Sequence, residues 1–68
     1  MNRTILVVEG TFFIRSLLKR TLQSIPDLSV TDVYDSHEAR QELATKRFNL
    51  IILDLNLHGE DGLRFLSN

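Results

Sequence analysis

The 68-residue sequence predicts a small α/β protein built on a parallel sheet. Two aliphatic runs, at 4–8 and 50–53, are short and unbroken, which is typical of strands buried on both faces. Two segments with helical periodicity lie between these runs, separated by a third and more polar strand. Because strands and helices alternate along the chain, right-handed crossovers should connect parallel strands. We therefore expect a single domain over residues 1–68, with three strands and flanking helices.

The first strand is expected at about 4–8, and it leaves an acid, Glu9, at its carboxyl end. A helix should follow over 13–25, with Thr11 as its N-cap. Pro26 ends this helix, because a proline disfavours the helical conformation of the residue before it. One stripe of the helix is expected to pack in the core, and it contains Ile14, Leu17, Leu18, Thr21, Leu22 and Ile25. The opposite, polar face carries Arg15, Lys19, Arg20 and Gln23.

A second strand and a second helix follow. Residues 28–33 alternate imperfectly between apolar and polar side chains, which favours a short edge strand that is less buried than the first. Asp35, with Glu38 three residues later, then resembles the capping box that starts a helix. This helix should end near Lys46 and Arg47, because positive charges suit the carboxyl end of a helix.

The most informative stretch is the third strand, 50–53, together with the acid that follows it, Asp54. Phe48, just before this strand, is expected to pack beneath the sheet. In open α/β sheets, ligands bind at the carboxyl ends of the strands, so Asp54 is the first candidate for chemistry. Gly59 and Gly62 follow, and they indicate a loop, because glycine allows the positive φ that tight turns need. A third helix is expected to begin at Leu63.

Composition excludes several function classes. The formal net charge is −1 and the sequence contains no cysteine, so we expect neither a basic surface for nucleic acid nor a disulfide or thiolate metal site. The aliphatic runs are too short to cross a membrane and no signal peptide is evident, which indicates a cytoplasmic protein. His37 and His58 lack a second ligand at metal-binding spacing and are expected to be surface residues.

Two motifs, in this order, resemble the receiver domain of bacterial response regulators. The first is Ile5-Leu6-Val7-Val8-Glu9. The second runs from Leu50 to Leu63 and reads Leu-Ile-Ile-Leu-Asp-Leu-Asn-Leu-His-Gly-Glu-Asp-Gly-Leu. The resemblance covers the whole chain, but only about the first half of a receiver. It implies a truncated flavodoxin-like receiver fold whose three strands lie in the order 2-1-3.

The resemblance also implies a role for Asp54. This residue aligns with the aspartate that accepts a phosphoryl group from a sensor histidine kinase in two-component signalling. Such a protein is a phosphoryl acceptor rather than a turnover enzyme. In the family, Mg²⁺ neutralises the phosphoryl oxygens. The implied metal ligands are Glu9, Asp54 and the backbone carbonyl of Asn56, whose side chain occupies a position facing the phosphoryl group.

The sequence departs from the family pattern around the reactive centre. Gly10 stands in place of the second acid, which is usually the direct metal ligand, so Mg²⁺ binding is expected to be weak or absent. His58 replaces the usual proline and removes a backbone constraint from the loop. The family's hydroxyl residue after strand four and its lysine after strand five have no counterpart in these 68 residues.

Two other protein classes are disfavoured, and a non-enzymatic alternative stays open. A phosphatase of the haloacid-dehalogenase type needs a second acid two residues after its nucleophile, where this chain has Asn56. A nucleotide-binding fold needs a glycine spacing that the segment 9–13 lacks. The open alternative is an interaction module derived from a receiver. The 2-1-3 order leaves Leu50–Leu53 as an aliphatic edge, which predicts self-association, most simply as a two-fold dimer with antiparallel strands.

Overall fold

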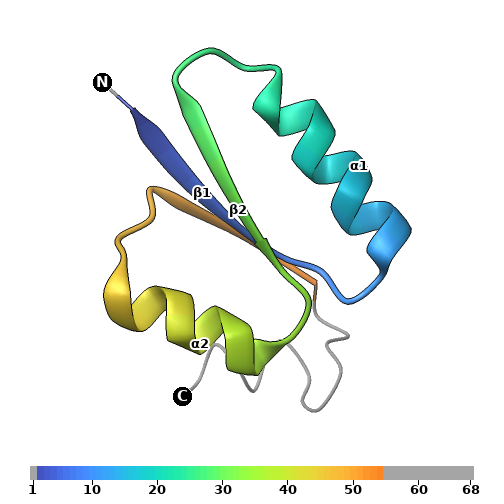
Figure 1. Ribbon diagram of the computed structural model, residues 1–68, viewed down its shortest axis with the longest axis vertical. Helices are drawn as coiled ribbons and strands as arrows, with labels where there is room; N and C mark the ends of the chain where they lie inside the picture. Colours follow the sequence, from blue (N-terminus) through green and yellow to red (C-terminus); the bar gives the residue numbers. More distant parts are fainter. Residues whose placement is uncertain (1, 55–68) are drawn as a thin grey trace.

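The computed structural model of the protein describes residues 2–54. Three strands and two helices alternate along them, as Figure 1 shows: β1 (Arg3–Val8), α1 (Phe12–Gln23), β2 (Leu28–Val33), α2 (Ser36–Thr45) and β3 (Leu50–Leu53). The strands are parallel, and their order is β2-β1-β3. The predicted α/β class and the 2-1-3 order are therefore confirmed. The expected glycine loop and third helix lie outside the described residues.

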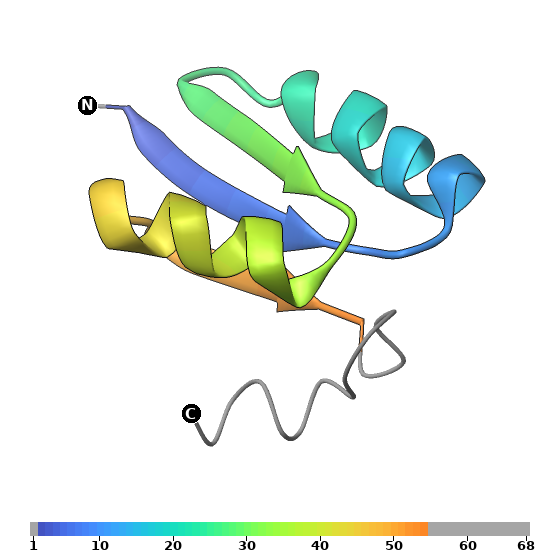
Figure 2. The ribbon, with the colours of Figure 1, turned by 60° about the horizontal axis from the view of Figure 1, so that its bottom comes forward.

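β1 lies in the middle of the sheet and supplies most of the buried core. α1 lies on one side of the sheet and α2 on the other (Figures 1 and 2). A central parallel strand between two helical layers is shielded on both faces, which is why its aliphatic run is continuous. The core cluster consists of Leu6, Val8, Val33 and Ala39, with Phe48 and Leu53 packed against it. Phe48 therefore packs beneath the sheet, as its position before β3 predicts.

α1 contributes less to the core than its apolar stripe predicts. None of its residues is buried. Ile14 and Leu17 are 45% and 53% exposed, and Ile25 just after the helix is 48% exposed, so the expected core positions of these three residues are wrong. The physical reason lies on the other flank of the helix. Arg15 and Lys19, expected to face solvent, form ion pairs with Asp32 of β2. These pairs hold the polar flank of α1 against β2 and leave part of its apolar stripe uncovered.

The two ends of α1 are set by local hydrogen bonds. Thr11 occupies the N-cap with an extended backbone (φ −89°, ψ 118°), as predicted, but its side chain makes no capping hydrogen bond. The helix ends at Gln23 rather than at Ile25. The amide of Ile25 donates to the carbonyl of Leu22 at 3.1 Å, which is the three-residue spacing of a tighter final turn.

α2 begins with a capping arrangement close to the box that the sequence predicts, with Asp35 at the N-cap. The Asp35 carboxylate accepts a hydrogen bond from the amide of Glu38 at 2.9 Å. In return, the Glu38 carboxylate accepts one from the amide of Tyr34 at 3.1 Å. These bonds satisfy amides around the first turn of the helix, where intrahelical acceptors are lacking. At its other end the helix stops at Thr45, close to the predicted boundary.

Replacing Asp35 with alanine should lower the free energy of unfolding by about 0.5–2 kcal/mol, because the Glu38 amide loses its acceptor. Urea denaturation followed by circular dichroism measures this loss. Asp35→Asn is the matched control, since its amide oxygen can still accept the bond and should keep most of the stability. An equal loss in both variants would show that the hydrogen bond is not what stabilises the start of α2.

Asn49 ties β3 to β1 at the amino ends of the strands. Its amide donates to the carbonyl of Thr4, and its side-chain oxygen accepts from the amide of Thr4, both at 2.8 Å. The hydroxyl of Thr4 also donates to the carbonyl of Arg47 at 3.0 Å. These bonds hold the start of β3 beside β1. They fix the register of the two strands at their amino ends, and the same register continues to their carboxyl ends.

Candidate functional site

Two acidic residues follow neighbouring strands at the carboxyl edge of the sheet, where the strand arrows point in Figure 2. Val8 of β1 and Leu53 of β3 are the last partners in register, so Glu9 and Asp54 come next on the two strands. The amide of Asp54 donates to the carbonyl of Val8 at 2.8 Å, which continues the ladder by one step. The fold therefore brings these two candidate residues to adjacent backbone positions.

Glu9 is held by β2 and by the loop that it starts. The residue is only 9% exposed, and its amide donates to the carbonyl of Val33 at 3.1 Å. Its carboxylate oxygen Oε1 accepts a hydrogen bond from the amide of Thr11 at 3.2 Å. One oxygen of Glu9 is thus engaged in its own loop, which also contains Gly10.

Arg15 lies close to this edge, although its place on the helical pattern predicts a solvent-facing side chain. Its Nη1 donates to the carbonyl of Glu9 at 3.0 Å, and its Nε lies 3.4 Å from Oδ2 of Asp32. The guanidinium also lies over the ring of Phe12, 5.5 Å from its centroid. Arg15 therefore fastens α1 to the ends of β1 and β2. The signal for this role was the acid in β2, which needs a cation when a helix covers it.

The described acids fit a divalent cation only as a pair. Within residues 2–54, no three His, Cys, Asp or Glu side chains are grouped closely enough to hold a metal ion. The nearby carboxylates of Asp35 and Glu38 are used at the start of α2. Mg²⁺ often takes one or two carboxylates and completes its octahedron with water and phosphate oxygens. Glu9 and Asp54 are two carboxylates of the kind that such a site uses, and their backbones are neighbours at this edge.

The other predicted site residues have different outcomes. Asn56 and His58 lie outside the described residues, so their implied roles stay predictions. His37 is exposed on α2, as expected for a surface histidine. Gly10 is half-buried between Glu9 and the helix and brings no side-chain oxygen to the edge.

Comparison with known proteins agrees with this arrangement. The family model of the response regulator receiver domain matches residues 5–68. A curated relative, protein-glutamate methylesterase/protein-glutamine glutaminase 2 of Shewanella oneidensis, is 36% identical over 64 residues. That alignment covers 93% of this chain but 18% of the relative, so the chain spans less than a fifth of that protein.

A solved structure shows the same fold. The crystal structure of a sensor protein from Polaromonas sp. JS666 matches with a TM-score of 0.88 at 24% sequence identity, covering 98% of this chain and 53% of the other. The two acids thus stand at the carboxyl edge of a sheet that lies within the segment matched by the family model. The chain belongs to the response regulator receiver domain family.

Proposed function

We propose that this chain is a phosphoryl acceptor in two-component signalling and that Asp54 receives the phosphoryl group. The observation that carries the proposal is the position of Asp54, beside Glu9 at the carboxyl edge of a receiver-family sheet. Its backbone is fixed to β1 by the hydrogen bond from its amide to Val8. A phosphoryl donor would therefore meet this residue at a defined place.

The proposed reaction transfers one phosphoryl group and involves no turnover. A carboxylate oxygen of Asp54 attacks the phosphorus of a phosphohistidine. The bond between phosphorus and the imidazole nitrogen breaks, and its electron pair stays on the nitrogen. The product is an acyl phosphate on Asp54, so the chain acts as an acceptor and not as an enzyme.

When bound, Mg²⁺ would neutralise charge on the phosphoryl oxygens. We propose that Glu9 and Asp54 hold it, with the carbonyl of Asn56 as a third ligand implied by the family resemblance. Because Oε1 of Glu9 accepts the Thr11 amide, Oε2 is the oxygen that can bind the ion without breaking that bond. Gly10 supplies no further ligand, and we expect the ion to be held weakly.

The partner that we propose is a sensor histidine kinase, because receiver domains are signalling modules. The Shewanella relative is named for two enzymatic activities, but only 18% of that protein aligns with this chain, so those activities are not proposed for it. Neither described helix is long and apolar enough to cross a membrane. A cytoplasmic location is part of the proposal.

Acetyl phosphate offers a test that needs no kinase. With Mg²⁺ present, the intact mass should rise by one phosphoryl group, because Asp54 displaces acetate from the phosphorus. Peptide mapping should place the group on Asp54. In the Asp54→Asn variant the modification should be lost completely.

Asp35→Asn is the control for this test, because Asp35 is a carboxylate near the same edge whose side chain caps α2. The Asp35→Asn variant should be phosphorylated to the same extent as the unchanged chain. An unmodified mass at every Mg²⁺ concentration, or a phosphoryl group mapped to another residue, would contradict the assignment of Asp54.

A further inference from the structure

We propose that Arg15 is a positioning residue for the acidic edge, because it fixes the backbone that presents Glu9 beside Asp54. Arg15 would act through Glu9 and would not itself contact the ion or the phosphoryl group. This role deepens the proposed function and rests on it, since it concerns how the same edge binds Mg²⁺. The contacts that support it lie between α1 and the carboxyl ends of β1 and β2.

Glu9 is held at three points, and Arg15 supplies the one that comes from a side chain of α1. The Glu9 amide donates to the carbonyl of Val33 at 3.1 Å, which continues the pairing of β1 with β2. The Glu9 carboxylate accepts the amide of Thr11 at 3.2 Å. The Glu9 carbonyl accepts a hydrogen bond from Nη1 of Arg15 at 3.0 Å. Arg15 therefore connects the helix directly to a residue of the acidic edge.

Gly10 makes this connection important. It lies between the carbonyl of Glu9 and the amide of Thr11, and glycine has the widest range of backbone angles. Without a bond to the Glu9 carbonyl, the peptide group between Glu9 and Gly10 is free to rotate. Such a rotation would carry the Thr11 amide away from the carboxylate that it holds. Fixing the carbonyl thus fixes the loop, and the loop in turn fixes the Glu9 carboxylate.

The guanidinium of Arg15 is itself held in one geometry. Its Nε lies 3.4 Å from Oδ2 of Asp32 on β2, while Nη1 reaches Glu9. It also lies over the ring of Phe12, and the Arg15 side chain is only 16% exposed. Guanidinium donors form a rigid fork that can bond a carboxylate and a carbonyl in fixed directions. A lysine has the same charge, but its single ammonium does not reproduce this fork.

The charge of Arg15 has the wrong sign to attract a metal ion, which separates positioning from simple electrostatics. A cation near the edge repels Mg²⁺, although Asp32 offsets part of this charge by pairing with Arg15 and Lys19. From charge alone, a variant that keeps the positive charge should bind Mg²⁺ as the unchanged chain does. Positioning predicts weaker binding, because the variant has lost the fork.

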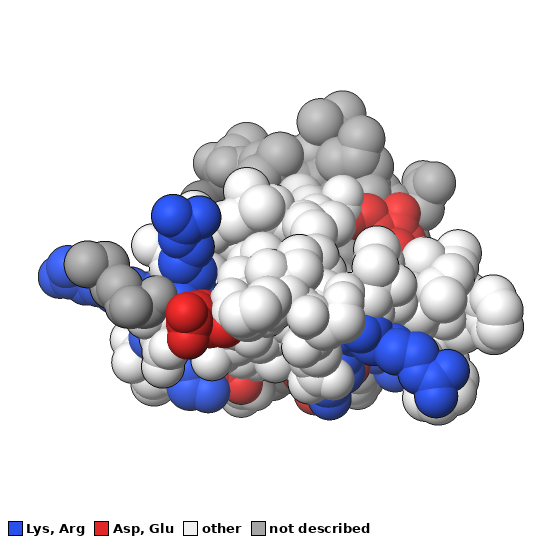
Figure 3. Space-filling view, turned by 90° about the horizontal axis from the view of Figure 1, so that it is seen from above, with Lys and Arg blue, Asp and Glu red and all other residues white. Residues whose placement is uncertain are grey.

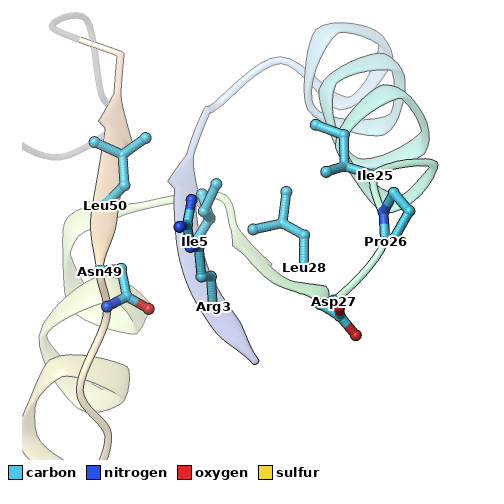
Figure 4. Close-up of a pocket in the computed structure, with 8 residues that line it drawn as sticks. All are labelled: Arg3, Ile5, Ile25, Pro26, Asp27, Leu28, Asn49 and Leu50. Carbon is cyan, nitrogen blue, oxygen red and sulfur yellow. The ribbon is translucent and has the colours of Figure 1, made fainter. Parts of the chain in front are cut away.

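Two other features of the described surface are distinct from this edge. A pocket of about 600 Å³ lies at the amino ends of the strands, where Asn49 and Leu28 line it (Figure 4). On the face seen in Figure 3, the acidic side chains lie apart from one another. Within residues 2–54, no three potential metal-binding side chains are grouped closely enough to hold an ion. Changes that Mg²⁺ causes at Glu9 and Asp54 therefore report on their own edge.

Nuclear magnetic resonance of the isotope-labelled chain measures the geometry and the affinity together. In Arg15→Lys, the Thr11 amide should exchange with solvent about threefold faster or more, because its acceptor is no longer held. The dissociation constant for Mg²⁺, from the shifts of Glu9 and Asp54, should rise by about tenfold, as expected when a residue that orients a ligand is changed. Arg20→Lys is the matched control, since Arg20 is exposed on the same helix, and it should change neither quantity.

Asp32→Asn tests the same connection from β2, because it leaves Arg15 in place and removes its ionic partner. It should also speed exchange of the Thr11 amide, and the double variant with Arg15→Lys should exchange no faster than the faster single variant. Additive effects, or an unchanged Thr11 amide in a folded Arg15→Lys chain, would overturn the positioning role. Circular dichroism checks that each variant is folded.

The Mg²⁺ affinity and the acetyl phosphate reaction distinguish this role from the proposed function. Labelling of Asp54 together with an Mg²⁺ affinity that is equal in Arg15→Lys and the unchanged chain would overturn the role of Arg15 alone. Failure of Mg²⁺ to shift Glu9 and Asp54 in the unchanged chain would overturn that role as well. An affinity that depends on Arg15, in a chain that acetyl phosphate does not label, would overturn only the assignment of Asp54 as phosphoryl acceptor.

Discussion

Replacing Leu6 with alanine is expected to lower the free energy of unfolding by about 2–5 kcal/mol, through lost burial and the cavity left behind. Leu6 is fully buried in β1 and belongs to the core cluster beneath α2. A domain of 68 residues should have a total stability of roughly 3–10 kcal/mol, so the substitution removes much or all of it. Urea denaturation followed by circular dichroism measures the change.

Leu17→Ala is the control, because it deletes the same atoms from a side chain that is 53% exposed. It should cost less than about 1 kcal/mol, since most of that leucine is already in contact with water. Similar losses at the two positions would contradict the burial that separates β1 from α1.

Restoring an acid at position 10 is expected to raise the affinity for Mg²⁺ by about tenfold or more, because ligand charge governs binding of this ion. Gly10 follows Glu9 directly and lies at the same edge as Asp54. Gly10→Asp would add a third carboxylate to a pair that fits Mg²⁺ only weakly. Calorimetric titration of both chains with MgCl₂ measures the difference.

Gly10→Asn separates charge from backbone effects, because asparagine has nearly the same shape as aspartate and no charge. Only the aspartate variant should gain affinity. If both variants bind Mg²⁺ as weakly as the unchanged chain, the missing carboxylate is not what limits binding. If both gain equally, the glycine backbone is the cause.

The sheet was predictable because its signals are local. The aliphatic runs of β1 and β3 are short and continuous, and the Asp35–Glu38 capping box marks the start of α2 within four residues. The adjacency of Glu9 and Asp54 also follows from the sequence. It requires only that each acid follows a strand and that the two strands are parallel neighbours in the sheet. Strand order was the step that required the family resemblance, since periodicity does not specify which strands pair.

The orientation of α1 was not predictable from its own residues. A helical stripe indicates which side chains can be buried together, but how far it is buried depends on where the helix sits over the sheet. Arg15 and Lys19 meet Asp32, a residue on a different element, and this contact turns the helix toward β2. The hydrogen bond from Thr11 to Glu9 was hidden for the same reason, because its geometry exists only in the folded loop.

The hydrogen bonds between Thr4 and Asn49 join residues 45 positions apart. β1 and β2 can pair after one crossover has formed, whereas β3 must wait for both crossovers, and the entropic cost of closure grows with loop length. β3 is therefore expected to dock late in folding and to detach early. Each detachment separates Asp54 from Glu9. Within the described residues, the lifetime of the acidic pair is thus expected to depend on how fast β3 separates from β1, while β1 and β2 can stay paired.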